Sequence, residues 1–358
     1  MGYVNEENET RQDPQKPLST LTCMGMGFEI VARHLELLIV PIVLDLLLWL
    51  GPRLSVAPLL NSANFRASLA ALETTTAEMQ QGVILLQQIF TELGTRFNLA
   101  VMMQPFPLEW PPSLMSSTYM SLKCAMGACP DIVSYPELVR PEILITSPWA
   151  VGGVSFLLML VGLGFNAVYL RAIGFRVIEE TEVALPGPVN PLWLCWRLLK
   201  LLALVLMLFF ALGNVVFFLA GCASLLHPFL SKMMNAIFFS LVTFILLHLI
   251  FAIPGIVQRQ IQPLQAVRES VMLTRGDFLN VLLLVVLVLV VWQGLNYVWS
   301  RPDPRTWQMW IGIGGHAFVS TALTATIFVF YQDRLRFLEM FLKTLAAREA
   351  AAHPIAGK

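Results

Sequence analysis

Six long runs of apolar residues follow one another along the chain and determine its architecture. Each run is about as long as the roughly 20 mostly apolar residues with which a helix crosses the hydrocarbon core of a bilayer. The runs lie at 28–59, 149–171, 199–224, 233–254, 278–299 and 307–331. They predict an all-α, multi-pass membrane protein with six transmembrane helices.

The amino-acid composition supports this fold class and indicates which class of partner the chain can bind. Charged residues make up 13% and hydrophobic residues 57% of the 358-residue chain, whereas about 25% of the residues in a soluble domain are charged. The formal net charge is zero, which gives no basis for binding nucleic acid. The expected partner is therefore the lipid bilayer.

The distribution of basic residues predicts the orientation, because short cytoplasmic loops carry an excess of Lys and Arg. Such residues gather after the second and fourth runs and in the carboxyl-terminal tail: Arg171, Arg176, Arg197, Lys200, Arg259, Arg268, Arg275, Arg334, Arg336, Lys343, Arg348 and Lys358. The two short turns on the opposite side hold Lys232, Arg301 and Arg305. Both termini are therefore expected in the cytoplasm of a bacterium, with the chain in its inner (plasma) membrane.

Five parts of the chain follow from this pattern. They are a disordered cytoplasmic tail (1–27), an interfacial helix with the first span (28–59), an extracytoplasmic segment (60–148), a five-span bundle (149–331) and a cytoplasmic amphipathic tail (332–358). The tail lacks the basic start and short apolar core of a signal peptide, so the first run is expected to act as an uncleaved anchor. Glu29 and Arg33 stand at i,i+4 and can form an ion pair.

An amphipathic helix is predicted in the outer segment, over residues 65–97. Its seam advances in alternating steps of four and three, as in a coiled coil or a helical hairpin. The seam consists of Phe65, Leu69, Leu72, Thr76, Met79, Val83, Leu86, Phe90, Leu93 and Phe97. Two interpretations are open: the helix packs on its own loop or the outer leaflet, or it docks a protein partner or a second copy of the chain.

Cysteines and cytoplasmic amphipathic stretches add two further expectations. Cys124 and Cys129 can form a disulfide in an oxidising compartment, with Cys222 as an alternative partner.

On the cytoplasmic side, Leu264–Arg275 and Arg334–Arg348 combine an apolar side with basic residues. Both stretches are typical of interfacial helices that lie against anionic lipid.

Polar side chains inside the spans are the candidates for function, because an ionisable group in hydrocarbon costs about 3 kcal/mol. At about 1.5 Å per residue, Asp45, His248 and Asn166 fall at similar depths and are expected to share a pocket that faces the cytoplasm. A second polar cluster is expected nearer the outer side, from His316, Gln293, Asn296 and Asn214. Hydrogen bonding between packed helices explains the same residues without any chemistry.

The sequence contains none of the common catalytic or cofactor motifs. It has no P-loop, no dinucleotide fingerprint and no convincing nucleophile–base spacing. No carboxylate cluster suits magnesium, and two cysteines without a nearby histidine do not favour zinc. We therefore expect neither enzymatic activity nor a metal or cofactor.

A family resemblance lies at two junctions in the second half of the chain. The first is the stretch 263–278 (PLQAVRESVMLTRGDF), and the second is the end of the last run, 330–336 (FYQDRLR). These resemble the membrane domain attached to some bacterial glycerophosphodiester phosphodiesterases, and related six-span proteins. The resemblance implies a six-span membrane fold. It implies no activity, because this sequence shows no soluble phosphodiesterase domain, and the long outer segment departs from the compact family pattern.

The leading functional hypothesis is a non-catalytic integral membrane protein. It would be an accessory or scaffold component of a membrane complex, or would act through contact with lipid. The alternative is a small proton- or ion-coupled transporter that uses Asp45 and His248. A lipid-modifying membrane enzyme is a minor third hypothesis.

Overall fold

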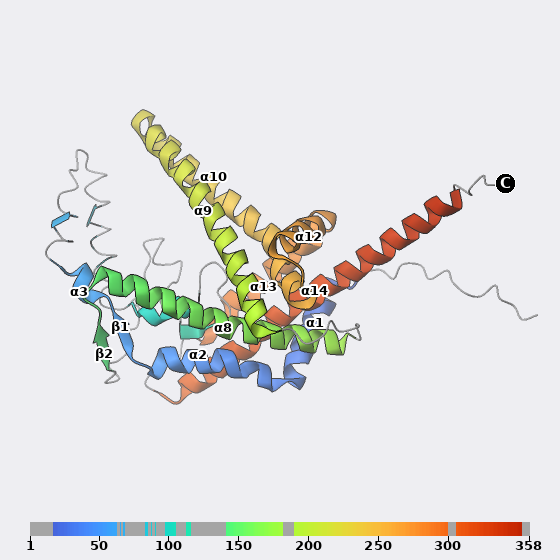
Figure 1. The fold of residues 1–358 in the computed structure, drawn as a ribbon, viewed down its shortest axis with the longest axis horizontal. Helices are drawn as coiled ribbons and strands as arrows, with labels where there is room; N and C mark the ends of the chain where they lie inside the picture. The colour runs from blue at the N-terminus through green and yellow to red at the C-terminus, as the bar shows by residue number, and fades with distance from the viewer. Residues whose placement is uncertain are drawn as a thin grey trace, which may run out of the picture.

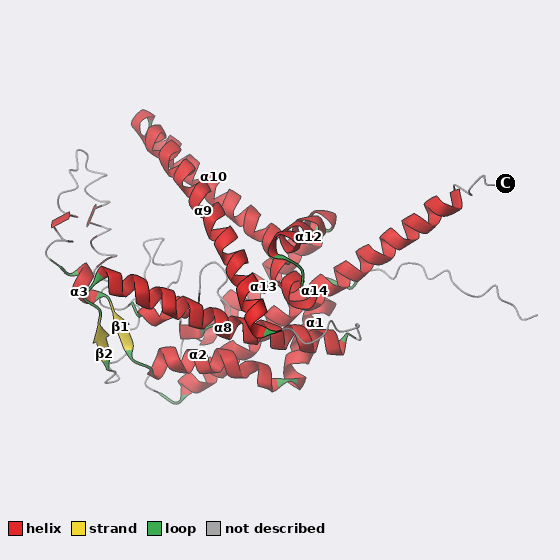
Figure 2. Cartoon of the chain, viewed as in Figure 1, coloured by secondary structure: helices red, strands yellow, loops and turns green. Residues whose placement is uncertain are grey.

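The computed structural model confirms the all-α class. It describes residues 17–62, 65, 67–68, 83–84, 87, 90, 97–104, 112–115, 141–181, 190–299 and 306–352. Helices make up nearly all the regular structure of these residues (Figure 2). The two strands among them, β1 (Arg53–Ser55) and β2 (Glu142–Leu144), pair in parallel with Arg53 opposite Glu142.

Five helical stretches in the described residues are long and apolar enough to cross a membrane. They correspond to the second to sixth predicted runs. The helices are α8 (Pro148–Glu180), α9 (Pro191–Leu226), α10 (Pro228–Leu249) continued by α11 (Ala252–Gln258), α13 (Phe278–Trp299) and α14 (Gln308–Ala352). The apolar part of α14 is 83% buried, against 11–22% for the others. Helix α14 is therefore the central element, and the others surround it.

The first apolar run does not form one long helix. It is divided among the end of α1 (Thr20–Arg33), the 3₁₀ helix η2 (Leu35–Leu38), α2 (Ile39–Leu50), β1 and the short α3 (Ala57–Leu60). Helix α2 has 12 residues and extends only about 18 Å at 1.5 Å per residue. For this reason the run is not among the five long apolar helices.

Helix α1 corrects the prediction of a disordered tail for residues 20–27, whereas residues 1–16 lie outside the described part of the chain. The helix begins at Thr20, and the Ser19 hydroxyl caps it by accepting a hydrogen bond from the Thr22 N–H at 3.1 Å. A Cβ at Gly27 would overlap the Thr326 side chain and lie 2.8 Å from the Ala322 carbonyl oxygen. The small residue Gly27 thus lets α1 lie directly on α14.

The buried face of α1 also contains Cys23. This side chain is fully buried against the bundle. Burial, followed by the negative charge of Asp333, raises the pKa of the Cys23 thiol to about 11. Because only the thiolate reacts readily, Cys23 acts as a packing residue.

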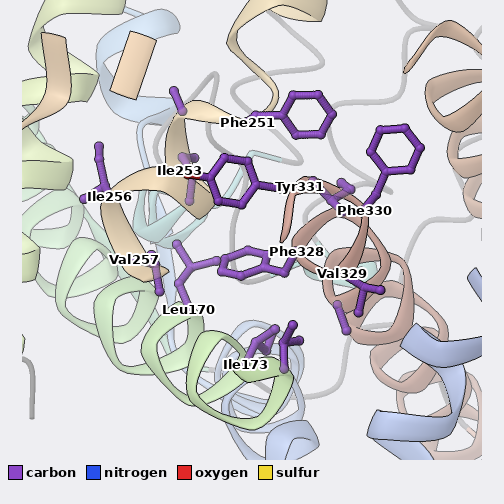
Figure 3. Close-up of a cluster of buried hydrophobic side chains, with 14 of the residues drawn as sticks. Leu170, Ile173, Phe251, Ile253, Ile256, Val257, Phe328, Val329, Phe330 and Tyr331 are labelled. Atoms are coloured by element: carbon purple, nitrogen blue, oxygen red, sulfur yellow. The ribbon is translucent and has the colours of Figure 1, made fainter. Parts of the chain in front are cut away.

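The main core lies where α8, α11 and α14 meet. Figure 3 shows Leu170 and Ile173 of α8 with Val257 of α11 and Phe328 of α14 in one cluster. The rings of Phe251 and Phe330 stack with their centroids 5.7 Å apart. All seven residues of α11 are buried, so this short helix is an internal element of the bundle.

Helices α9 and α10 form a hairpin that projects from the rest of the molecule (Figure 1). Each helix begins with proline at its first position and a side-chain cap: Asn190 accepts from the Leu192 N–H at 3.0 Å, and His227 from the Phe229 N–H at 3.1 Å. Much of the outer part of the hairpin is exposed and apolar, and Phe217 is 82% exposed.

One end of the bundle is held together by a network of charges, here called the charged belt. It joins the ends of α1 and α8 and the middle of α14 to the segment from α11 to α13. Its pairs are Arg33–Glu29, Arg33–Glu180, His34–Glu180, Arg176–Glu36, Arg259–Glu269, Arg334–Asp277 and Arg334–Asp333. The predicted Glu29–Arg33 ion pair is confirmed. Arg334 is buried, and its Nε lies 2.6 Å from Asp277 Oδ2.

The opposite end, here called the strand end, contains β1, β2 and the first turns of α8 and α14. The Arg53 N–H donates to the Pro141 carbonyl at 3.0 Å. The ring of Trp49, near the end of α2, lies edge-on to that of Trp310 in α14, with centroids 5.6 Å apart. Helices α8 and α14 therefore both run from the strand end to the charged belt.

Candidate functional site

Asp45 ties the outer segment to α2. It is fully buried, and three donors of residues 113–115 surround its carboxylate. The Ser113 hydroxyl donates to Oδ1, the Leu114 N–H to Oδ2 at 3.2 Å, and the Met115 N–H to Oδ1 at 3.1 Å. Apolar side chains close the site around this carboxylate: Leu44, Leu48, Trp49, Val101, Met103, Leu114, Met115, Met309 and Ile313. The geometry is that of a structural anchor, because the hydrogen bonds satisfy both carboxylate oxygens.

His248 lies at the break between α10 and α11. Its Nδ1–H donates to the Phe244 carbonyl at 2.8 Å, and its ring packs on Phe244 and Phe278. The Ser270 hydroxyl, from α12 (Pro263–Gly276), donates to the His248 carbonyl at 2.6 Å and accepts from the Phe251 N–H at 3.1 Å. The Ser270 side chain thus forms hydrogen bonds with backbone groups on both sides of the break between α10 and α11.

The predicted shared pocket of Asp45, His248 and Asn166 is wrong. Asp45 bonds to residues 113–115 at the strand end, whereas His248 packs beside Phe278, next to the Asp277 of the charged belt. The predicted depths assumed that each span is one straight helix with a rise of about 1.5 Å per residue. The first run is divided into several elements, and α10 ends before α11, so these depths do not hold.

Asn166 instead belongs with polar residues of α14. Tyr169 donates to Thr321 at 3.1 Å, and Thr181 to Gln332 at 2.8 Å. These pairs are separated by 152 and 151 positions, so α8 and α14 run parallel in a constant register. The same register places Asn166 level with residues 317–318, between His316 and Ser320.

Buried polar residues of both helices lie at this level of the bundle and are here called the mid-depth cluster. His316, Ser320 and Thr324 follow at i,i+4 spacing on α14, and Ser320 Oγ lies 3.3 Å from His316 Nε2. All three are buried. Asn166 is fully buried, and neither atom of its amide has a hydrogen-bond partner. An unpaired buried amide costs about 1–3 kcal/mol, so Asn166 is the group in the cluster with unused hydrogen-bonding capacity.

The second predicted cluster is only partly supported. His316 is buried as expected, but Gln293 is exposed on α13. Asn214 is exposed on α9, where its amide donates to the Phe210 carbonyl of its own helix at 2.6 Å. The side chain of Asn296 is outside the described part. The described members therefore do not form one buried cluster, because His316 is buried whereas Gln293 and Asn214 are exposed.

Most of the predicted seam lies outside the described residues, as do Cys124 and Cys129. This applies to Leu69, Leu72, Thr76, Met79, Leu86 and Leu93. Of the described members, Phe65 and Phe90 have rings in edge-on contact, with centroids 5.0 Å apart. They lie 25 positions apart in sequence, a separation that one straight helix would turn into about 37 Å. Within the described part, Cys23, Cys195 and Cys222 are free thiols.

These sites limit the chemistry that the described residues can perform. Among them, no group of three or more His, Cys, Asp or Glu is arranged to hold a metal ion. The side chains of the mid-depth cluster are hydroxyls, an amide and an imidazole, which can bind water or a small polar solute. Sequence reasoning missed Tyr169, Ser320, Thr321 and Thr324. The i,i+4 spacing from His316 was the available signal.

Comparisons with protein-family models, curated proteins and solved structures gave no significant match. The resemblance to the phosphodiesterase-associated membrane domain therefore stays a prediction.

Proposed function

We propose that this chain is a six-span, non-catalytic membrane protein with both termini in the cytoplasm. It acts as an accessory or scaffold component of a membrane complex and through direct contact with lipid. The observation that carries the proposal is the state of Asp45, the strongest candidate for intramembrane chemistry. Both oxygens of its carboxylate already accept hydrogen bonds from residues 113–115.

A sixth crossing is supported by the two ends of α8. At the charged belt, His34 pairs with Glu180 and Glu36 with Arg176. At the strand end, Arg53 lies opposite Glu142 in the sheet, just before α8 begins. The segment 34–53 therefore connects the same two levels as α8, one of the five long apolar helices.

Basic and aromatic residues support the charged belt as the cytoplasmic boundary. At the start of α9, the Arg197 guanidinium lies over the Trp193 ring and the Lys200 ammonium over the Trp196 ring. Tryptophan with Lys or Arg is typical of a bilayer surface. The predicted interfacial stretch Leu264–Arg275 lies within α12, which exposes Leu264, Met272, Arg268 and Arg275, a combination suited to anionic lipid headgroups.

Cysteine labelling at the two ends of α8 tests this topology. In a variant with all native cysteines replaced by serine, Glu142→Cys and Glu179→Cys place one thiol at each end. A membrane-impermeant maleimide should label the first in intact cells and the second only after permeabilisation. The reverse pattern would invert the orientation, and equal labelling of both in intact cells would show that α8 does not cross.

Purification in mild detergent, with mass spectrometry of co-purifying proteins, tests the accessory role. Ile84 in the outer segment is apolar and 54% exposed, and the exposed polar Gln87 lies one turn away. A stoichiometric partner should be lost in Ile84→Glu and retained in Gln87→Glu, which adds the same charge. A protein that purifies alone would contradict the accessory role.

The second candidate is the small transporter, which an observation other than Asp45–His248 pairing now favours. The buried, unpaired Asn166, which lies level with the buried His316 and Ser320, resembles the mid-depth polar sites at which transporters bind solutes. Proton or ion flux into liposomes that contain the purified protein would support this candidate. The flux should then fall in Asn166→Leu.

A further inference from the structure

An apolar pocket lies at the strand end, between the outer segment and α8. Its volume is about 670 Å³, within the 300–1,000 Å³ typical of ligand sites. It is open on one side. Four parts of the chain line it, with the residues Val56, Leu59, Leu60, Ser62, Phe65, Ser68, Phe90, Phe97, Leu99, Pro148 and Val151.

The lining selects the chemistry of the ligand. None of the described residues that line the pocket is charged, and their polar side chains are the hydroxyls of two serines. The Ser62 hydroxyl already accepts a hydrogen bond from the Phe65 N–H at 3.3 Å. A charged or strongly polar ligand would lose its hydration here without compensation. A hydrocarbon chain makes no hydrogen bonds with water that it would lose here, and it would gain contacts with the aromatic rings of Phe65, Phe90 and Phe97.

The pocket lies at the start of α8, a helix whose outer surface is apolar and exposed. Pro148 and Val151, in the first turn of that helix, form one wall. Trp149 between them is 90% exposed, and Phe156 and Leu157 further along α8 are also exposed. A tryptophan at the start of a long apolar helix is typical of the bilayer–water boundary. A lipid chain can therefore pass from the surface of α8 into the pocket without crossing water.

We propose that this pocket binds one acyl chain of a phospholipid from the outer leaflet. The inference rests on the bilayer placement proposed above. It gives the outer segment a specific role: residues 65 and 90, which belong to the predicted seam, face a lipid chain together with α3 and α8.

Photo-crosslinking tests the pocket. The full-length protein is reconstituted with a phospholipid that carries a diazirine on one acyl chain, and labelled peptides are identified by mass spectrometry. We expect labelling at Leu60, Phe97 and Val151 in addition to Phe156. Labelling at Phe156 without any in the pocket would overturn the pocket but not the bilayer placement. No labelling at Phe156 would contradict the placement itself.

A variant that fills the pocket sharpens the result. In Val151→Trp the added ring occupies the cavity, so labelling at Leu60 and Phe97 should fall about tenfold, as for a loss of one decade in affinity. Val161→Trp is the matched control, since Val161 is an exposed residue of the same helix that does not line the pocket. Equal labelling of the pocket in both variants would overturn the proposal. So would crosslinks at Val151 between two copies of the chain, which would mean that a second copy occupies the pocket.

Discussion

Asp45→Ala should lower the free energy of unfolding by about 3 kcal/mol, because it leaves buried donors without an acceptor. Those donors are the Ser113 hydroxyl and the N–H groups of Leu114 and Met115. The loss should appear as a lower thermal unfolding midpoint in detergent and as faster proteolysis near residues 112–115. The variant thus tests whether Asp45 holds the outer segment in place.

Two further variants separate the anchor from a general effect of removing a carboxylate. Asp45→Asn retains one acceptor oxygen and should show a smaller loss. Glu339→Ala removes an exposed acid whose partner, Arg259, lies 3.8 Å away, and such surface pairs contribute about 0–1 kcal/mol. A stable Asp45→Ala that instead abolishes ion flux in liposomes would refute the structural role and favour the transporter.

Sequence alone identified most of the long helices, because length and apolarity determine them locally. The run at 278–299 coincides with α13, and the run at 149–171 lies within α8. Helix α8 extends to Glu180, because its last turns pack in the core through Ile173 and Val177 and join the charged belt through Arg176 and Glu180. The amphipathic stretch Leu264–Arg275 likewise became α12, with Gln262 as its cap.

Contacts between distant segments could not be predicted in this way. The donors around Asp45 lie 68–70 positions away in sequence, in a region that shows no periodic pattern. The common level of Asn166 and His316 depends on the parallel register of α8 and α14, which only their cross-helix hydrogen bonds reveal. Depth along a single helix says nothing about which helices are neighbours, so polar residues at one predicted depth need not meet.

Glycine substitutions in α8 should have opposite effects two residues apart. A Cβ at Gly162 would overlap the Met103 carbonyl oxygen and lie 2.7 Å from the Met103 Cα. Met103 is the last residue of the 3₁₀ helix η3 (Leu99–Met103), and backbone atoms cannot rotate away as a side chain can. Gly162→Ala should therefore destabilise the protein by about 2 kcal/mol, in the range of overpacking in a closely packed core.

Gly164→Ala is the matched control, since no atom lies within 4 Å of its Cβ position. There the added methyl group should stabilise the helix by up to about 1 kcal/mol, the usual gain of alanine over glycine. Thermal unfolding of both variants in the same detergent gives the comparison. Equal midpoints would mean that η3 does not lie on α8 in solution. The outer segment would then depend on Asp45 for its attachment, and the wall of the acyl-chain pocket at Leu99 would not be held beside α8.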